Sequence, residues 1–341
     1  MPMSLTIQSA VSLKPFNTFG VDVVASQFAE AHSDQDVLDA LVYSREHDLP
    51  LLVIGGGSNL LLTQDIQALV LRMASRGIRI LREDCSDAIV EAEAGEPWHP
   101  FVQSCLELGL AGLENLSLIP GTVGAAPMQN IGAYGVEIKD VFHSLVALDR
   151  QSGEVREFGL EDCAFGYRDS VFKQQVGRWL ILRVRFSLSR VARLHLEYGP
   201  VRQRLDEMGI KEPSPLHVSR AISAIRSEKL PDPAVLGNAG SFFKNPVVSG
   251  ERFAVIKGAH PGVVGYPQAD GGVKLAAGWL IETAGWKGLR EGDAGVHALQ
   301  SLVLVNYGQA SGTQLLNLAR RIQQDIGERF GVELEMEPNL Y

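Results

Sequence analysis

The chain has 341 residues, 45% hydrophobic and 21% charged, so it is globular and long enough for two or three domains. Its formal net charge of −9 argues against a nucleic-acid-binding protein, because such proteins bind by neutralising phosphates; any anion-binding groups must be local. No run reaches the roughly 18 apolar residues of a membrane span, and Met1–Ala10 lacks the basic start and apolar core of a signal sequence, so we expect a cytoplasmic protein.

Strands and helices alternate in the first third of the chain. A β-branched, apolar run predicts a strand at 21–28, and Ser33 then caps a predicted helix at 35–47. The continuous apolar run 51–54 is typical of a buried strand. Further predicted elements are strands at 68–71 and 88–94, and a helix at 98–108 that ends at Gly109.

The rest of the chain continues the mixed pattern. The predicted elements are strands at 144–149 and 179–188, helices at 199–208 and 217–230, a strand that carries Ser241, a helix at 275–283, a strand at 301–306, a helix at 313–330 and a strand at 332–337. Pro231 and Pro233 mark the expected domain boundary, because two prolines so close together end a helix. Neither a repeat nor a low-complexity segment is visible.

A glycine-rich segment follows the buried strand at 51–54. Its residues, Gly55, Gly56, Gly57, Ser58 and Asn59, supply unhindered backbone N–H groups of the kind that bind a pyrophosphate. The third glycine of the dinucleotide fingerprint is absent, and so is the Gly-Lys-Ser/Thr of a P-loop. A glycine-rich turn without a ligand is the alternative.

A second glycine-rich segment, Ile119–Gly135, is harder to explain as a simple connection. Long loops inside compact domains are usually functional. Its small residues allow a flat ring to approach the backbone, and Gln129 and Asn130 could hydrogen-bond the edge of a heterocycle. Two such segments far apart in the chain suggest one extended cofactor that is contacted in two places, and FAD has that length.

Two cationic segments have competing interpretations. Arg168, in Phe165-Gly166-Tyr167-Arg168-Asp169-Ser170, could clamp a carboxylate with two hydrogen bonds, although an ion pair with Asp169 is the better interpretation in isolation. Arg226 and Lys229 suit the C-terminal end of the predicted helix at 217–230, or could bind a nucleotide diphosphate.

Ser241 lies between Gly240 and the aromatic pair Phe242-Phe243. A hydrolase nucleophile would occupy Gly-x-Ser-x-Gly, but the residue two positions after Ser241 is Phe243. A turn followed by a short apolar strand is one interpretation, and a proton-donating serine is the other.

The histidines and cysteines form no metal motif. The eight histidines are scattered without a His-x-x-x-His pair, and the three cysteines, Cys85, Cys105 and Cys163, have no metal-ligand spacing. An odd number of cysteines without a Cys-x-x-Cys pair favours a reducing compartment. We therefore expect no metal site.

Taken in order, these segments resemble one family over nearly the whole chain, the UDP-N-acetylenolpyruvoylglucosamine reductases. The resemblance rests on the following segments together: Asn17-Thr18-Phe19-Gly20, Gly55–Asn59, Ile119–Gly135, Gly166–Ser170, Lys229–Pro233, Gly237–Pro246 and Gln268-Ala269-Asp270-Gly271. Tyr198 matches the tyrosine that folds over substrate in the longer of the two family types. One departure is Asn339, where better-known members carry an arginine.

The resemblance implies an α+β fold of three domains. Residues 1–73 and 74–230 would form an FAD-binding fold of the vanillyl-alcohol-oxidase type, and 231–341 a substrate-binding domain. It further implies a flavoenzyme of peptidoglycan synthesis, in which NADPH reduces noncovalent FAD, leaves, and is replaced in the same pocket by UDP-N-acetylglucosamine enolpyruvate. The product would be UDP-N-acetylmuramate, and we expect a monomer.

The same resemblance assigns roles to particular residues. Ser241 would protonate C2 of the substrate, while Arg168 and a protonated Glu337 would stabilise the enolate. Residues that match the flavin-binding positions are Gly55, Gly56, Gly57, Ser58, Asn59, Pro120, Gly121, Thr122, Gly124, Ala125, Gln129, Asn130, Gly132, Ala133 and Tyr134. Those that match substrate-binding positions are Tyr134, Tyr198, Arg226, Lys229, Asn245 and Gln300.

Two other functions fit the same fold. One is an FAD-dependent oxidase or dehydrogenase of the vanillyl-alcohol type, against which the absence of an obvious flavin-attachment motif counts. The other is a non-catalytic nucleotide-sugar-binding protein, against which the presence of Arg168, Ser241 and Glu337 counts.

Overall fold

The computed structural model describes residues 5–341. Residues 1–4 lie outside the described residues. They belong to Met1–Ala10, the segment in which we expect no signal sequence. The described residues form two compact units: unit 1 comprises 5–11, 25–56 and 67–228, and unit 2 comprises 12–24, 57–66 and 229–341. The division after Glu228 lies close to the boundary predicted at Pro231, whereas the assignment of two short N-terminal segments to unit 2 has no signal in the sequence. The predicted division at residue 73 stays a prediction.

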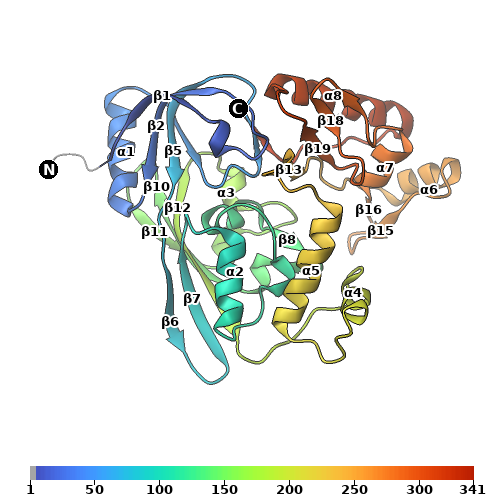
Figure 1. Cartoon of the computed structure of the whole chain (residues 1–341), viewed down its shortest axis with the longest axis horizontal. Coiled ribbons are helices and arrows are strands. Elements are labelled where there is room, and N and C mark those ends of the chain that lie inside the picture. The colour runs from blue at the N-terminus through green and yellow to red at the C-terminus, as the bar shows by residue number, and fades with distance from the viewer. Residues whose placement is uncertain (1–4) are drawn as a thin grey trace. The chain divides into compact units, whose positions relative to one another are not determined.

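A four-stranded sheet opens unit 1, in the order β1 (Gln8–Ser12), β2 (Val24–Ala31), β5 (Ile66–Met73) and β3 (Leu51–Ile54). β3 and β5 are parallel, with Leu51 paired to Leu69. Helix α1 (Asp34–Glu46) begins with a capping box formed by Ser33 and Asp36, and it packs its apolar face on this sheet (Figure 1).

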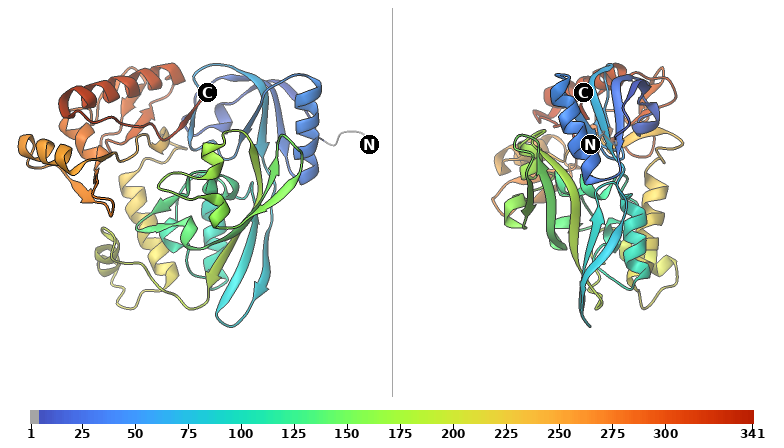
Figure 2. Two further views of the ribbon diagram at one scale, coloured as in Figure 1. Left: turned by 180° about the vertical axis from the view of Figure 1, so that it is seen from behind. Right: turned by 90° about the vertical axis from the view of Figure 1, so that its left-hand side faces the viewer.

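The second sheet of unit 1 is antiparallel. Its order is β11 (Val155–Phe158), β10 (Phe142–Asp149), β12 (Trp179–Ser189), β7 (Asp87–Glu93) and β6 (Ile78–Glu83). Helices α2 (Trp98–Glu107) and α5 (Pro215–Lys229) lie on one side of it (Figure 2). The remaining short elements of this unit are β8 (Gly132–Ala133), β9 (Val136–Glu137), α3 (Val171–Gln174) and α4 (Val201–Glu207).

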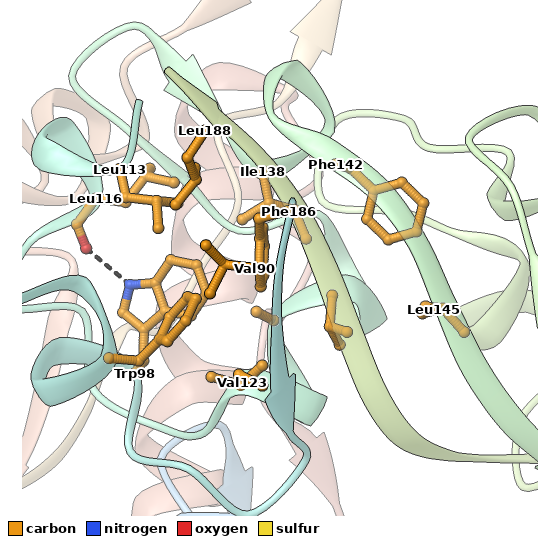
Figure 3. Close-up of a cluster of buried hydrophobic side chains, with 14 of the residues drawn as sticks. Val90, Trp98, Leu113, Leu116, Val123, Ile138, Phe142, Leu145, Phe186 and Leu188 are labelled. Atoms are coloured by element: carbon orange, nitrogen blue, oxygen red, sulfur yellow. Dashed lines mark hydrogen bonds between the residues drawn. The ribbon is translucent and has the colours of Figure 1, made fainter. Parts of the chain in front are cut away.

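The core of unit 1 lies between α2 and the antiparallel sheet. Trp98 and Phe101 of α2 pack against Val90 and Phe186 of the sheet, and all four are buried (Figure 3). The Trp98 indole N–H donates a hydrogen bond of 2.8 Å to the carbonyl of Leu116, so its one polar atom is satisfied. This core fixes the first turn of α2 and the loop that follows it.

Unit 2 contains an antiparallel sheet in the order β13 (Gly237–Ser241), β19 (Val303–Asn306), β18 (Ala294–Val296) and β17 (Arg290–Glu291). Helices α7 (Ala277–Thr283) and α8 (Gly312–Phe330) belong to the same unit (Figure 1). A smaller sheet has the strand order β14 (Val247–Val248), β16 (Val273–Leu275) and β15 (Gly265–Pro267). Helix α6 (Gly250–Ala259) follows β14 in the chain. β4 (Leu60–Leu61) pairs in parallel with β20 (Asn339–Leu340).

Most of the strongly patterned elements are confirmed, including the strand at 51–54 and the helices at 35–47, 98–108 and 313–330. The predicted strand at 332–337 is wrong. That segment forms only an isolated bridge between Met336 and Phe243, so it is extended without forming a ladder. Strand β6 and helix α6 were not predicted. Among residues 5–341, none of the helices is long and apolar enough to cross a membrane.

Candidate active site

The two glycine-rich segments meet within unit 1. A Cβ added to Gly55 would lie 2.5 Å from Oγ1 of Thr122, and one added to Gly56 would lie 3.1 Å from Cα of Gly121. A Cβ on Gly124 would lie 2.5 Å from Cβ of Ala94. The glycines therefore permit loops to pack against each other, which is a structural reason for them beside the ligand-binding one.

This junction offers backbone donors. Within residues 5–341, the amides of Gly56, Gly121 and Thr122 donate no hydrogen bond to another protein group. Thr122 is buried and Gly121 half-buried, and N–H groups in such places are normally paired, whereas Gly56 is exposed; neighbouring amides of this kind can form a concave anion site. The donors and the close-packed, side-chain-free backbone fit the pyrophosphate of FAD. They also explain how the cofactor could be bound without the dinucleotide fingerprint.

Gly57 is held differently from its neighbours. Its φ of +64° is left-handed, and a Cβ there would lie 2.0 Å from the carbonyl oxygen of Phe16. The amide of Thr18 donates a hydrogen bond of 3.0 Å to the Gly57 carbonyl. Only glycine fits this position, so the turn is anchored to the segment at 16–18 in unit 2.

The long segment 119–135 is a folded structure. It contains a 3-10 turn, Val123–Gln129, which ends at Asn130 with a left-handed φ of 44°. The Asn130 side chain is fully buried, and its Nδ2 donates to Oε2 of Glu137 at 2.9 Å and to the carbonyl of Gly166 at 3.1 Å. Its Oδ1 accepts the amide of Lys139. Both N–H groups are engaged within the fold, and the predicted contact of Asn130 with the cofactor stays a prediction.

Arg168 lies in a tight turn between Gly166 and Asp169, whose backbones exchange hydrogen bonds of 3.0 and 3.4 Å. Its φ is +55°, an uncommon conformation for a residue other than glycine. Nη2 of Arg168 donates to the carbonyl of Gly132 at 3.1 Å. The turn therefore fixes the guanidinium to the long segment.

Asp169 does not hold the neighbouring arginine. Its carboxylate accepts the amide of Ser170 at 2.9 Å and Nε2 of Gln174 at 2.8 Å. The ion pair between Arg168 and Asp169, which is the better interpretation in isolation, is therefore not formed. Oγ of the fully buried Ser170 donates to the carbonyl of Met128 at 2.7 Å, a second tie between the turn and the long segment.

A cationic and aromatic group lies elsewhere in unit 1. Arg226, in the last turn of α5, donates from Nε to the carbonyl of Leu118 at 3.2 Å. Burial lowers the pKa of Arg226, and the nearby Tyr134 acts in the opposite direction. Burial raises the pKa of the Tyr134 phenol, while the charge of Arg226 lowers it. The desolvated cation beside a phenol suits an anionic ligand such as a diphosphate.

Tyr198 lies next to this group. Its ring centroid is 6.3 Å from that of Tyr134, with the rings perpendicular, and the residue is 59% exposed. The adjacent leucines, Leu194 and Leu196, pack on the apolar cluster formed by α4 and α5. Tyr198, the tyrosine predicted to cover the substrate, is therefore exposed, while Leu194 and Leu196 hold its segment against the protein.

In unit 2, a β-bulge presents Ser241. The register of β13 against β19 shifts between Asn238, which pairs with Val305, and Ser241, which pairs with Val303. Gly240 supplies the bulge with a φ of +72°, and Oδ1 of Asn238 accepts its amide at 2.9 Å. Bulges commonly re-aim a side chain near an active site. Phe242 and Phe243, both buried, then fix the strand in the core.

Glu337 lies on the segment that runs beside Ser241. Its amide donates to the carbonyl of Phe242 at 2.8 Å, and the amide of Lys244 donates to the carbonyl of Glu335 at 2.9 Å. Nδ2 of Asn59 donates to the Glu337 carbonyl at 3.4 Å. The structure therefore brings Ser241 and Glu337, far apart in sequence, onto adjacent segments of unit 2.

Two further predicted residues of unit 2 meet at the start of α7. Oδ1 of Asn245 accepts the amide of Ala277 at 3.0 Å, and a Cβ on Gly278 would lie 3.7 Å from Oε1 of Gln300.

Lys229 is exposed at the end of α5. Asn339, which stands where the resemblance implies an arginine, donates to the carbonyl of Asn59 from its amide at 3.0 Å and from its side chain at 3.4 Å.

Comparisons with known proteins identify the domains of the chain. The model of an FAD binding domain matches residues 25–159, and the model of the C-terminal domain of UDP-N-acetylenolpyruvoylglucosamine reductase matches residues 232–341. The protein is thus an FAD-dependent oxidoreductase, which confirms the predicted cofactor.

Full-length relatives define the family. The chain is 83% identical to the UDP-N-acetylenolpyruvoylglucosamine reductase of Pseudomonas syringae pv. syringae, over 99% of this chain and 100% of that protein. It is 67% identical to that of Pseudomonas aeruginosa, over 99% and 100%, and 56% identical to that of Chromobacterium violaceum, over 98% and 99%. The chain belongs to the UDP-N-acetylenolpyruvoylglucosamine reductase family.

A solved structure supports the fold. The crystal structure of the Thermus caldophilus reductase superimposes with a TM-score of 0.68 at 26% identity, covering 99% of each chain. The predicted α+β fold with its FAD-binding part is confirmed.

Proposed function

We propose that this protein reduces UDP-N-acetylglucosamine enolpyruvate to UDP-N-acetylmuramate, with NADPH as the electron donor. The observation that carries the proposal is the pairing of the Ser241 and Glu337 segments through the Phe242 carbonyl, in a chain with a family-specific C-terminal domain. That pairing supports the proposal because it joins the backbone segments that carry Ser241 and Glu337, the acid and the carboxyl that protonation and stabilisation of an enolate would require.

FAD, when bound, supplies the relay that accepts a hydride from NADPH and delivers it to C3 of the enolpyruvyl group. Delivery leaves negative charge at C2 of the substrate, spread into its carboxylate. Arg168 provides positive charge to that group, and its left-handed turn and hydrogen bond to Gly132 keep the guanidinium preorganised.

Ser241 donates its hydroxyl proton to C2. Serine is a weak acid in water, but it suffices here because the carbanion is a far stronger base. Glu337 is protonated in this proposal and donates a hydrogen bond to the enolate, since a second anion there would raise the barrier. The Ser241 proton is then restored by Lys229 or by water.

The remaining residues bind the two ligands. The glycine-rich segments would hold FAD through the amides of Gly56, Gly121 and Thr122. The other residues proposed to line this site are Gly55, Gly57, Ser58, Asn59, Pro120, Gly124, Ala125, Gln129, Asn130, Gly132, Ala133 and Tyr134. Six residues hold the sugar nucleotide: Tyr134, Tyr198, Arg226, Lys229, Asn245 and Gln300. NADPH uses the same pocket, so turnover is ping-pong.

Stopped-flow measurement of the two half-reactions tests the proposal. Purified protein should carry noncovalent flavin, NADPH should bleach it without the sugar nucleotide, and the sugar nucleotide should then restore its absorbance. Rapid reoxidation by oxygen with an alcohol substrate, and no response to the sugar nucleotide, would support an oxidase instead. A colourless protein without a flavin spectrum would exclude both.

A further inference from the structure

We propose that His99 is a positioning residue for Arg226, and that it acts through the backbone of Leu118. The inference rests on the proposed function, in which Arg226 binds the diphosphate of the sugar nucleotide. His99 matched no motif in the sequence, and the reaction just described gives it no role.

Leu118 links the two side chains through its own backbone. Its amide donates a hydrogen bond of 3.0 Å to Nδ1 of His99, and its carbonyl accepts a hydrogen bond of 3.2 Å from Nε of Arg226. One residue therefore connects the first turn of α2 to the last turn of α5. If the amide contact is lost, the orientation of the carbonyl that holds Arg226 is no longer fixed.

The backbone of Leu118 needs such support. Its φ of +58° is left-handed, a conformation that is unfavourable for an L-residue with a Cβ. Strained backbone persists where its surroundings fix it, and it is concentrated at functional sites. His99 is itself fixed, because it follows Trp98, whose indole is buried and bonded to the carbonyl of Leu116.

The hydrogen bond specifies the protonation state of His99. Nδ1 can accept the Leu118 amide only when it carries no proton, so the bound imidazole is neutral, with its hydrogen on Nε2. Burial lowers the pKa of His99 below its ordinary value, and the positive charge of Arg226 lowers it further. Arg226 in turn faces Tyr134 from the long segment and Arg168 from the turn at 166–169.

Protonation of His99 would remove the acceptor and add a second cation beside Arg226. Because only the neutral form supports Leu118, affinity for the sugar nucleotide should be full above the His99 pKa and fall as the pH drops below it. The ligand adds no acid limb in this range, since a diphosphate esterified at both ends lacks the second ionisation near pH 6 of a phosphate monoester. His99 acts here as a pH-sensitive support for substrate binding.

Kinetics from pH 5 to 8 on three proteins test this role: the wild type, His99→Gln and His99→Ala. In the wild type, KM for the sugar nucleotide should rise up to about tenfold for each pH unit below the His99 pKa, with a smaller change in kcat. His99→Gln keeps an acceptor but cannot titrate, so its KM should be nearly independent of pH. His99→Ala should raise KM about 3- to 10-fold at every pH, the loss expected for one hydrogen bond.

A wild-type KM that stays flat as the pH falls through the His99 pKa measured by NMR, or that falls at acidic pH, would overturn the proposal, as would an unchanged acid limb in His99→Gln. Should His99→Ala lose its flavin, the His99→Gln profile decides alone. NMR titration of labelled histidine separates this inference from the proposed function. In Arg226→Gln the pKa of His99 should rise, and the Leu118 amide shift should titrate with His99, whatever substrate the enzyme uses. An unmoved pKa would contradict the arrangement itself.

Discussion

The amide of Glu337 donates a hydrogen bond of 2.8 Å to the carbonyl of Phe242, the residue that follows Ser241. A second backbone bond, from Lys244 to Glu335, fixes the alignment of the same two segments. These backbone bonds, together with buried Phe242 and Phe243, therefore fix the two segments that carry Ser241 and Glu337. Groups held in this way are preorganised, which is what an enzyme needs to stabilise developing charge.

Ser241→Ala should separate the two half-reactions. Flavin reduction by NADPH should stay within a few-fold of wild type, because no proton is delivered to carbon in that step. Reoxidation by the sugar nucleotide should slow by roughly 10²- to 10⁴-fold, the usual contribution of a positioned acid. Stopped-flow absorbance of the flavin measures both rates.

Ser249→Ala is a matched control, since Ser249 lies in the same unit and only caps α6 by accepting the amide of Arg252. It should leave both half-reactions unchanged. If Ser241→Ala slows both equally, the serine positions ligands and is not the proton donor.

Gly55→Ala tests the junction of the glycine-rich segments. The new Cβ would lie 2.5 Å from Oγ1 of Thr122, so the two segments must separate, and overpacking of this kind typically destabilises by about 1–3 kcal/mol. We expect reduced flavin content and a lower unfolding temperature. The ratio of flavin to protein absorbance and a thermal unfolding curve measure the two effects.

A second substitution tells whether the clash is the cause. Thr122→Ala in the Gly55→Ala background removes Oγ1 and should restore part of the flavin content, whereas Thr122→Ser keeps a hydroxyl and should restore less. Equal flavin content in Gly55→Ala and wild type would show that the close approach is unnecessary for cofactor binding.

The local part of this fold follows from sequence pattern. The capping signal at Ser33 and the periodic apolar face of 313–330 predict helices that the structure contains almost to the residue. In these helices the helix propensity, the capping residues and the pattern of buried side chains all favour the same structure, so no information about distant segments is needed to predict them. The segment 332–337 shows the opposite case: its alternating apolar residues suggest a strand, but its neighbours pair with it at only one bridge.

Contacts between distant segments could not be read from the sequence. Nothing in the composition of 55–57 and 119–125 says that they touch, since the same glycines would serve a cofactor contacted at two separate places. Asn130 shows the same limit, because a side-chain amide can bond a ligand or the protein equally well, and the contacts with Glu137 and Gly166 carry no sequence signal. Leu118 has no sequence signal, since leucine rarely adopts a left-handed φ.

Tyr198→Ala should act mainly on the sugar nucleotide. Tyr198 is 59% exposed, with its ring beside that of Tyr134, so its removal should not unfold unit 1. We expect KM for the sugar nucleotide to rise roughly tenfold, as for loss of an aromatic contact worth about 1.4 kcal/mol. NADPH reduction of the flavin should be unchanged, and an equal loss in that step would contradict a role in covering substrate.

Gly327→Ala should stabilise the protein. Gly327 lies inside α8, its φ is not left-handed, and a Cβ there would meet no atom within 4 Å. Glycine within a helix is less stable than alanine by about 0.5–1 kcal/mol. Gly331→Ala is the matched control: Gly331 ends α8 with a φ of +57°, and a Cβ would collide with Arg252, so this variant should be destabilised. Urea unfolding of both measures the two signs, and a stabilising Gly331→Ala would contradict the C-cap.

Thiol labelling should distinguish the three cysteines. Cys85 is exposed, whereas Cys105 and Cys163 are buried, and burial raises the pKa of each buried thiol to about 12. Only the thiolate reacts readily with disulfide reagents, so the buried pair should be inert at pH 8 for two reasons, lack of access and lack of ionisation. We expect one fast-reacting thiol in the native protein and three in denaturant, and Cys85→Ser should abolish the fast phase. Any fast-reacting thiol that remains in that variant would show that the core around α2 opens on the timescale of labelling, which the packing of Trp98 and Phe101 argues against.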